Sequence, residues 1–489
     1  MDSNLKAPPA GMKDRLWPVG LAAFIGVMLL TGGTSQPGDM MVYLHSGLSL
    51  VVLVIALSRL ASRGLPSRLS FYGAWLAIAI ALFPLLQLVP LPPQIWQQLP
   101  THAIVSQNMT LTGMAASSMT LSLSPEVTRL DALALLPSLA LFFGALTVPL
   151  RQMSCASAVV LACAVIATGF GLGQVSQGEQ SALYLYDSET SIATGTFSNR
   201  SFFAAFLYSS IVFAGLAGAL LRQRRKWPGW LAGLFAGGLI AVLLVGIALS
   251  GSRMGLLLAV PAILFALLFL CGEVAAPNVK TVAVGLLAVL AAIFVVGQSS
   301  MLGLLRLAGS DPFSDERASV LITSLSMLKN TLPFGTGFGS FVPLYQARET
   351  PAMLQPEYIN HVHNDWLELV LEGGVMALAL EVLFVIWFAA AFIRIWRYGR
   401  GHSTAVFQRA ATLVVPLLLV HSAVDFPLRT PALMSLFAFC CAVMTLPPDV
   451  QTSGPSQASR YKSRRRPVQP PSEPAPFRRP QSAFGAKTD

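Results

Sequence analysis

Long apolar runs separated by short polar segments dominate the chain from Leu16 to Leu446. Many of these runs approach about 20 residues, the length an α-helix needs to cross a hydrocarbon core about 30 Å thick. The runs are continuous rather than alternating, so they predict helices and not the strands of a barrel. We therefore predict an all-α polytopic membrane protein with about twelve spanning helices. The expected spans are 16–33, 40–58, 71–90, 130–149, 154–172, 201–221, 229–249, 254–270, 279–297, 366–393, 406–424 and 430–446.

The composition agrees with this pattern. Of the 489 residues, 54% are hydrophobic and only 11% are charged, whereas soluble domains average roughly 25% charged residues. This deficit excludes an ordinary soluble protein. The five cysteines lie in or beside apolar runs, so we expect them to pack between helices rather than to form disulfides or a metal site.

The basic residues predict an orientation. Arginine clusters follow the second, sixth and tenth predicted helices, at residues 59–68, 222–226 and 394–400. Because loops on the cytoplasmic side are enriched in Lys and Arg, these clusters place both termini in the cytoplasm. The longer loops, at about 91–129, 173–200 and 298–365, then lie on the outer face.

The chain divides by composition into two parts. Residues 1–446 form the predicted transmembrane domain, and residues 447–489 form a Pro- and Arg-rich cytoplasmic tail that we expect to be disordered. The tail either contacts anionic lipid headgroups or a partner, or is only a solvated segment that fixes topology. The net charge of +10 reflects this tail and the basic inner loops, so it predicts no nucleic-acid partner.

With the inner charges assigned, two outer arginines become candidates for anion binding. Arg253 follows Ser250-Gly251-Ser252, a small-residue break between two apolar runs, and Arg200 follows Ser198-Asn199 at the start of the sixth predicted helix. A guanidinium can hold phosphate oxygens bidentately, and a capped helix N-terminus favours an anion. The alternative is that both arginines only anchor helices at the membrane interface.

The loop 298–365 contains its own predicted elements. Residues 315–330 predict an amphipathic helix that presents Arg317 near its start and has Ala318, Leu321, Ile322, Leu325 and Leu328 on one face. Gly335-Thr336-Gly337-Phe338-Gly339 follows. No strand–turn–helix context surrounds these glycines, so they predict a tight turn rather than a nucleotide site.

A polar motif precedes the tenth predicted helix. In His361-Val362-His363-Asn364-Asp365, either Asn364 or Asp365 can cap that helix, which leaves His363 at its outer mouth. An imidazole can accept a proton near neutral pH, so His363 is a candidate general base. Asp365 shares a helical face with Glu368 and Glu372, which argues against a lipid-facing surface there.

Two further readings concern neighbouring residues. His361 and His363 with Asp365 or Glu368 could ligate a metal, but no other His or Cys cluster lies nearby, so no metal is expected. His421 and Asp425 are four residues apart and share a face. They either orient other groups of the site or pair to lower each other's cost of burial.

These motifs together resemble the O-antigen ligase and polymerase superfamily of bacterial membrane glycan transferases. The resemblance rests on Gly195-Thr196-Phe197-Ser198-Asn199-Arg200, Ser250-Gly251-Ser252-Arg253-Met254-Gly255, the glycine turn and His363-Asn364, which is followed at the expected interval by Gly374. It covers roughly residues 190–430. Ala377 stands where the family often has Gly, Thr or Val, a mild departure.

The resemblance implies a fold similar to the GT-C glycosyltransferases, with short helices in the large periplasmic loop. It also implies a bacterial inner membrane, with the site at its periplasmic face. It implies an undecaprenyl-diphosphate-linked glycan as donor, a glycan or lipid acceptor, and no cofactor, metal or nucleotide sugar. By the same resemblance Arg253, Arg317 and Arg200 hold the diphosphate, and His363 assists the acceptor hydroxyl. Asn364, Asp365, His421 and Asp425 are expected to support the site.

The acceptor stays open between lipopolysaccharide ligation, polysaccharide polymerisation and protein glycosylation, with a lean toward surface or exopolysaccharide polymerisation alongside other envelope-assembly proteins. The alternative function is a transporter or flippase of lipid-linked sugars. That function would be accompanied by inverted repeats and charges along a path through the membrane, whereas the charges here gather at one face.

Overall fold

The structure is a computed structural model that describes residues 12–36, 39–114, 117–186, 192–223, 227–271, 313–349, 359–398 and 404–447. All of these belong to one compact unit, Met1–Asp449. The predicted span at 279–297 and the predicted tail from residue 448 onward lie outside the described residues.

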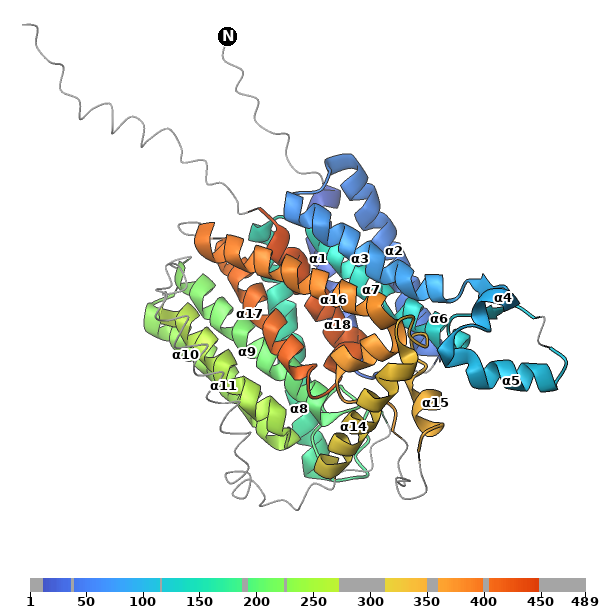
Figure 1. The fold of residues 1–489 in the computed structure, drawn as a ribbon. Helices are drawn as coiled ribbons and strands as arrows, with labels where there is room; N and C mark the ends of the chain where they lie inside the picture. The colour runs from blue at the N-terminus through green and yellow to red at the C-terminus, as the bar shows by residue number, and fades with distance from the viewer. Residues whose placement is uncertain are drawn as a thin grey trace, which may run out of the picture. The chain divides into compact units, whose positions relative to one another are not determined.

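The described chain is almost entirely helical, as Figure 1 shows. Its one strand pair is antiparallel, with Pro90 opposite Thr120. The helices and strands are α1 (Met12–Thr31), α2 (Asp39–Arg63), α3 (Arg68–Gln87), β1 (Pro90–Leu91), α4 (Pro93–Trp96), η1 (Pro100–His102), α5 (Ala103–Leu111), β2 (Met119–Thr120), α6 (Pro125–Ala134), α7 (Leu136–Leu146), η2 (Leu150–Gln152), α8 (Ser154–Gln177), α9 (Arg200–Gln223), α10 (Gly229–Ser250), α11 (Arg253–Cys271), α14 (Phe313–Thr331), α15 (Phe341–Gln346), α16 (Asp365–Tyr398), α17 (Ala405–His421), η5 (Pro427–Arg429) and α18 (Pro431–Thr445).

The helices make this a multi-pass membrane protein. Within the described ranges, 9 helical segments are long and apolar enough to cross a membrane, and each matches a predicted span. The predicted spans 406–424 and 430–446 appear as the shorter apolar helices α17 and α18. The predicted total of about twelve stays a prediction, since 279–297 is outside the described chain.

Helix α9 forms the centre of the core. Its apolar window is 83% buried, far more than that of any other spanning segment among the described residues. It packs against α8, α10, α11 and α17. A Cβ atom added at Gly255 would lie 2.4 Å from the Cβ of Ala204, so only glycine lets α11 approach α9 this closely.

Helix α16 is broken where the glycine turn enters it. Gly374 has φ 63° and ψ −149°, and this kink frees the carbonyl oxygen of Glu372. That oxygen accepts bonds from the backbone N–H groups of Thr336 (3.1 Å) and Gly337 (2.9 Å) and from the Gln87 side chain (3.0 Å). The predicted tight turn is confirmed, since Gly335, Gly337 and Gly339 all have positive φ.

Helix α14 is present as predicted, but its predicted apolar face is only partly covered: Leu321 and Leu328 pack against a core, whereas Ile322 and Leu325 do not. The buried side chains are Val320, Ser324 and Met327, whereas Ile322 is 68% exposed and Leu325 is 49% exposed. The buried face packs with Phe341, Tyr345 and Leu371 in a small separate core. The position of that core, and not the periodicity of α14 alone, decides which side of the helix is covered.

Candidate active site

The loop that carries His363 is held against the end of α17. His363 has φ 58°, the one non-glycine residue with a positive φ in the described chain. After it, the Asn364 side chain donates to the Ala423 carbonyl (3.0 Å) and accepts from the backbone N–H of Leu367 (3.0 Å). The backbone N–H of Asp365 donates to the Ser422 carbonyl (2.8 Å). Asn364 is thus the helix cap, and it fixes His363 at the mouth of α16.

His363 faces Asp425, which joins a buried chain of polar groups. The Nδ1 atom of His363 lies 3.4 Å from Oδ1 of Asp425, longer than an ordinary hydrogen bond. Asp425 Oδ2 lies 3.9 Å from Nε2 of His421, and Nδ1 of His421 lies 3.0 Å from the hydroxyl of Tyr208. The His363 side chain keeps 24% of its surface exposed, while Asp425 and His421 are buried. If Nδ1 of His363 carries the proton and faces Asp425, the other ring nitrogen, Nε2, is free to accept a proton.

The three carboxylates on one face of α16 converge on Arg429 of η5. The guanidinium lies 3.5 Å from Asp365, 3.3 Å from Glu368 and 3.1 Å from Glu372. Burial of Arg429 disfavours its charged form, but the negative charges around it outweigh that effect and raise its pKa well above the usual value. The carboxylate face of α16 is therefore buried against a cation. This is expected, because charged side chains in a membrane protein face the protein interior and pair with opposite charges.

Glu368 also holds the residues that precede His363. One carboxylate oxygen lies 2.7 Å from Nδ1 of His361, and the other accepts the backbone N–H of Val362 (2.8 Å). Burial lowers the pKa of His361, yet the charge and hydrogen bond of Glu368 outweigh this and raise it overall. His361 thus forms a buried ion pair when protonated.

The two loop histidines do not converge on a common point between carboxylates. His361 turns to Glu368 and His363 to Asp425, while both rings contact Phe426, with centroids 4.3 and 4.9 Å away. In the described part of the chain no group of three or more His, Cys, Asp or Glu side chains is placed to hold a metal.

Arg200 and Arg253 begin two helices that pack together at the same end. Arg200 is the first residue of α9 and Arg253 the first of α11. Asn199 accepts the N–H of Ser201 (2.7 Å), and Ser252 accepts the N–H of Gly255 (3.1 Å), so both helices are capped. A Cβ atom added at Gly251 would lie 4.0 Å from Nη1 of Arg200. The Arg200 guanidinium therefore lies beside the turn that carries Arg253.

A chain of aromatic contacts connects this arginine pair to the histidine. The ring of Phe202, two residues after Arg200, lies 5.2 Å from that of Phe426, which in turn contacts His363. The structure thus brings the region of Arg200 and Arg253 and the His363–Asp425–His421 group to the same part of the fold. Arg317 belongs to the first turns of α14, and its side chain lies outside the described residues.

Two residues of this cluster were not predicted as site residues. Arg429 could have been found, because three carboxylates on one face of a membrane helix require a buried cation, and Arg429 was among the few outer arginines. Tyr208 gave no signal, because it sits in a run of α9 that is buried on every side.

Comparison with known sequences finds one family model that matches part of the chain. Residues 238–382 match the family model described as O-antigen ligase. This range holds Arg253, Arg317 and His363 and ends before His421 and Asp425. No curated protein matches the chain significantly. The match confirms, over these residues, the resemblance to the O-antigen ligase and polymerase superfamily drawn from the motifs.

Proposed function

We propose that this protein transfers a glycan from an undecaprenyl diphosphate donor to an acceptor hydroxyl at the periplasmic face of a bacterial inner membrane. The match to the O-antigen ligase family supports a ligase or polymerase type of transfer. The acceptor would be a glycan or a lipid, and the product a surface polysaccharide, lipopolysaccharide or exopolysaccharide. The fold would be of the GT-C type, with both termini in the cytoplasm.

In the proposed reaction the acceptor oxygen attacks the anomeric carbon of the donor sugar as the bond from that carbon to the diphosphate breaks. His363 takes the acceptor proton on Nε2 while Asp425 steadies its Nδ1 proton. Negative charge then grows on the departing diphosphate. Arg253 and Arg200 would stabilise this charge, with Arg317 as a third contributor. A single displacement of this kind inverts the configuration at the sugar.

The observation that carries the proposal is the pairing of His363 with a buried carboxylate, connected through Phe426 to the helix ends that bear Arg200 and Arg253. A base beside an anion-binding helix end suits transfer from a diphosphate. Transport of a lipid-linked sugar is not favoured, since the family match points to ligase chemistry.

The test is transfer by the purified protein in lipid nanodiscs, with a fluorescent lipid-diphosphate glycan and a matched acceptor. We expect His363→Ala to slow transfer by roughly 10²–10⁴-fold, the usual contribution of a general base. Arg253→Lys should also slow it, because a lysine keeps the charge but loses the planar fork.

The matched control is Ser326→Ala, a truncation on an exposed position of α14. It should transfer at the parent rate. Normal transfer by both His363→Ala and Arg253→Lys, at equal protein amounts, would refute the proposed chemistry. Accumulation of unreacted donor in cells that carry these variants would support it.

A further inference from the structure

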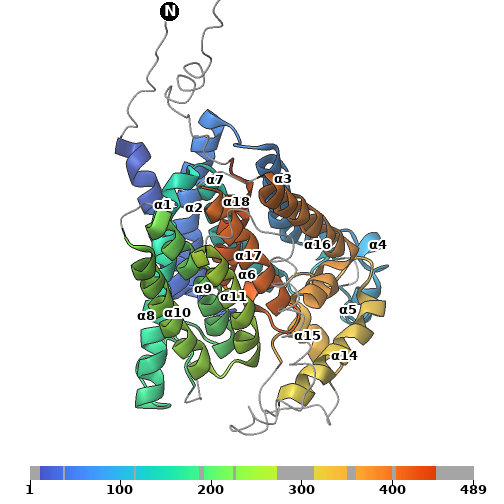
Figure 2. The same ribbon diagram turned by 90° about the vertical axis from the view of Figure 1, so that its left-hand side faces the viewer.

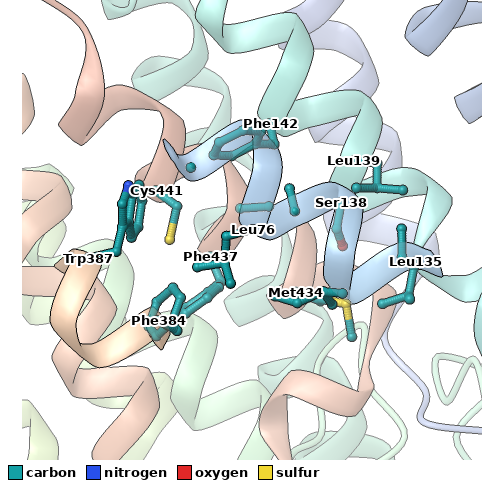
Figure 3. Close-up of a pocket in the computed structure, with 15 residues that line it drawn as sticks. Leu76, Leu135, Ser138, Leu139, Phe142, Phe384, Trp387, Met434, Phe437 and Cys441 are labelled. Carbon is teal, nitrogen blue, oxygen red and sulfur yellow. The ribbon is translucent and has the colours of Figure 1, made fainter. Parts of the chain in front are cut away.

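An apolar slot lies among four helices on the side of the bundle away from the arginine pair. It is bounded by α3, α7, α16 and α18, and Figure 3 shows its lining side chains. Figure 2 shows α3 and α16 on one side of α17 and α18, with α10 and α11 on the other. The packing agrees, because α9 contacts α17, α17 contacts α18, and α18 contacts α3 and α16.

The slot is long and narrow. On α3 its lining runs from Gly73 to Ala81, nine residues that span about 12 Å of helix. Its walls are aromatic on one side, with Phe384, Trp387 and Phe437, and its volume is about 140 Å³. An apolar cavity of about 150 Å³ takes up a molecule the size of benzene, so this slot has room for a segment of hydrocarbon chain.

One polar group faces the slot. Ser138 of α7 is only 7% exposed, and its Oγ atom has no hydrogen-bond partner within the described chain. Figure 3 shows it between Leu139 and Met434 in the slot wall. A buried hydroxyl without a partner is costly, and the helix could have carried an alanine there at no such cost. Ser138 therefore points to a ligand that brings a polar atom to an otherwise apolar site.

The surroundings determine which kind of ligand reaches the slot. All four helices that line it are apolar, and α3, α7 and α16 belong to segments that can cross a membrane. Ile80 on its rim is 37% exposed, so the slot opens on the outside of the bundle. What surrounds the bundle at that depth is hydrocarbon from lipids.

We propose that this slot is a binding site for the hydrocarbon chain of a membrane lipid, with Ser138 contacting an oxygen atom on or near that chain. Packed interiors rarely leave such a void empty, and small residues on facing helices, Gly73, Ala77 and Ala438, keep it open. The occupant is a phospholipid acyl chain, because phospholipids supply the hydrocarbon that surrounds the bundle at this depth.

One end of the slot is directed toward the candidate active site. The end of the slot at Ala81 lies six residues, about 9 Å along α3, from Gln87. The Gln87 side chain donates a hydrogen bond to the Glu372 carbonyl at the kink of α16. Given the proposed function, the head group of this lipid would emerge beside the His363 loop from the side opposite Arg200 and Arg253. It is then a second lipid, distinct from the donor.

The experiment is photo-crosslinking of the full-length protein in nanodiscs that contain one of two probes. One probe is a phosphatidylethanolamine with a mid-chain diazirine, and the other is a diazirine-bearing polyprenyl phosphate. Labelled peptides are mapped by mass spectrometry. We expect the phosphatidylethanolamine probe to label α3 or α18 within the slot. Labelling by the polyprenyl probe alone would assign the slot to the donor class of lipid and overturn the proposal.

Filling variants from opposite walls test occupancy. Ala77→Leu and Ala438→Leu should each reduce labelling in the slot by roughly tenfold, because a leucine takes the space that the chain needs. Ala241→Leu on the exposed side of α10 is the matched control and should leave that labelling unchanged. Ser138→Ala should reduce it by roughly two- to tenfold, the range for loss of one hydrogen bond.

Absence of slot labelling by the phosphatidylethanolamine probe, or labelling that neither filling variant reduces in monodisperse protein, would overturn the proposal. The readout needs no turnover, so the outcome is separate from that of the transferase test. His363→Ala should label like the parent protein even where it fails to transfer glycan.

Discussion

A histidine in the left-handed backbone region is strained, and His363 keeps this conformation because its neighbours are tied down on both sides. Glu368 holds Val362 before it, and Ala423 and Ser422 receive bonds from Asn364 and Asp365 after it. The imidazole can therefore face Asp425 in the free protein. Pre-organisation of this kind lowers the cost of reaching a reactive arrangement.

At this scale the Asp425 carboxylate is expected to affect rate more than binding. Asp425→Asn keeps the shape but removes the charge that steadies His363, so the transfer rate should fall by roughly 10–10³-fold while the KM for donor changes little. Steady-state kinetics in nanodiscs measures both quantities. An unchanged rate in Asp425→Asn would show that His363 acts without this partner.

The ion pair of His361 predicts a pH-dependent stability. Because folding raises the pKa of His361, its stabilisation is complete below its unfolded pKa near 6.5 and is lost as pH rises through the higher folded value. The melting temperature in detergent should therefore drop as pH increases above neutrality. His361→Asn should flatten this part of the profile, and an equally steep profile in that variant would assign the dependence to another group.

At the scale of elements, the kink of α16 couples the site helix to the glycine turn. The turn packs at Gly374 and donates two backbone N–H groups to the buried Glu372 carbonyl that the kink frees. Since the side chain of Glu372 pairs with Arg429, one residue joins the turn to the charged cluster. A substitution that shifts the turn should therefore also shift Glu372 and the other carboxylates on that face of α16.

Gly374→Ala tests this coupling. An added Cβ would lie 2.1 Å from the carbonyl oxygen of Pro333, at a φ that disfavours alanine, so the variant should lose about 2 kcal/mol or more of stability. Thermal unfolding in detergent reports the loss. Gly237→Ala in α10, where an added Cβ meets nothing within 4 Å, is the control and should be neutral or slightly stabilising. Equal melting temperatures for both variants would contradict the requirement for glycine.

At the scale of the whole molecule, the helices place two different surfaces on either side of α17 and α18. Arg200 and Arg253 begin α9 and α11 on one side, and the apolar slot lies beside α3 and α16 on the other. The His363 loop, held to the end of α17, stands between them. Under the proposed function, this arrangement would place the donor diphosphate and the lipid in the slot on opposite sides of His363.

The orientation in the membrane is open to a direct test. In a chain without its five cysteines, Gln98→Cys should react with a membrane-impermeant maleimide on intact spheroplasts, because its loop is predicted outside. Leu65→Cys, in an Arg-rich loop, should react only after permeabilisation. The reverse labelling pattern would place the His363 end of the bundle in the cytoplasm and remove the proposed periplasmic site.

The sequence alone determined the membrane class, the approximate spans and the motif residues, because apolar runs and helix caps are local features that the chain displays directly. Asn199 and Asn364 cap their helices as predicted. The partners of the buried charges were decided only by tertiary structure. Arg429 meets Glu368 and Glu372 from over fifty residues away, and the covered side of α14 depends on where Phe341 packs. Periodicity shows that a face is apolar or charged, but only the folded arrangement decides what that face meets.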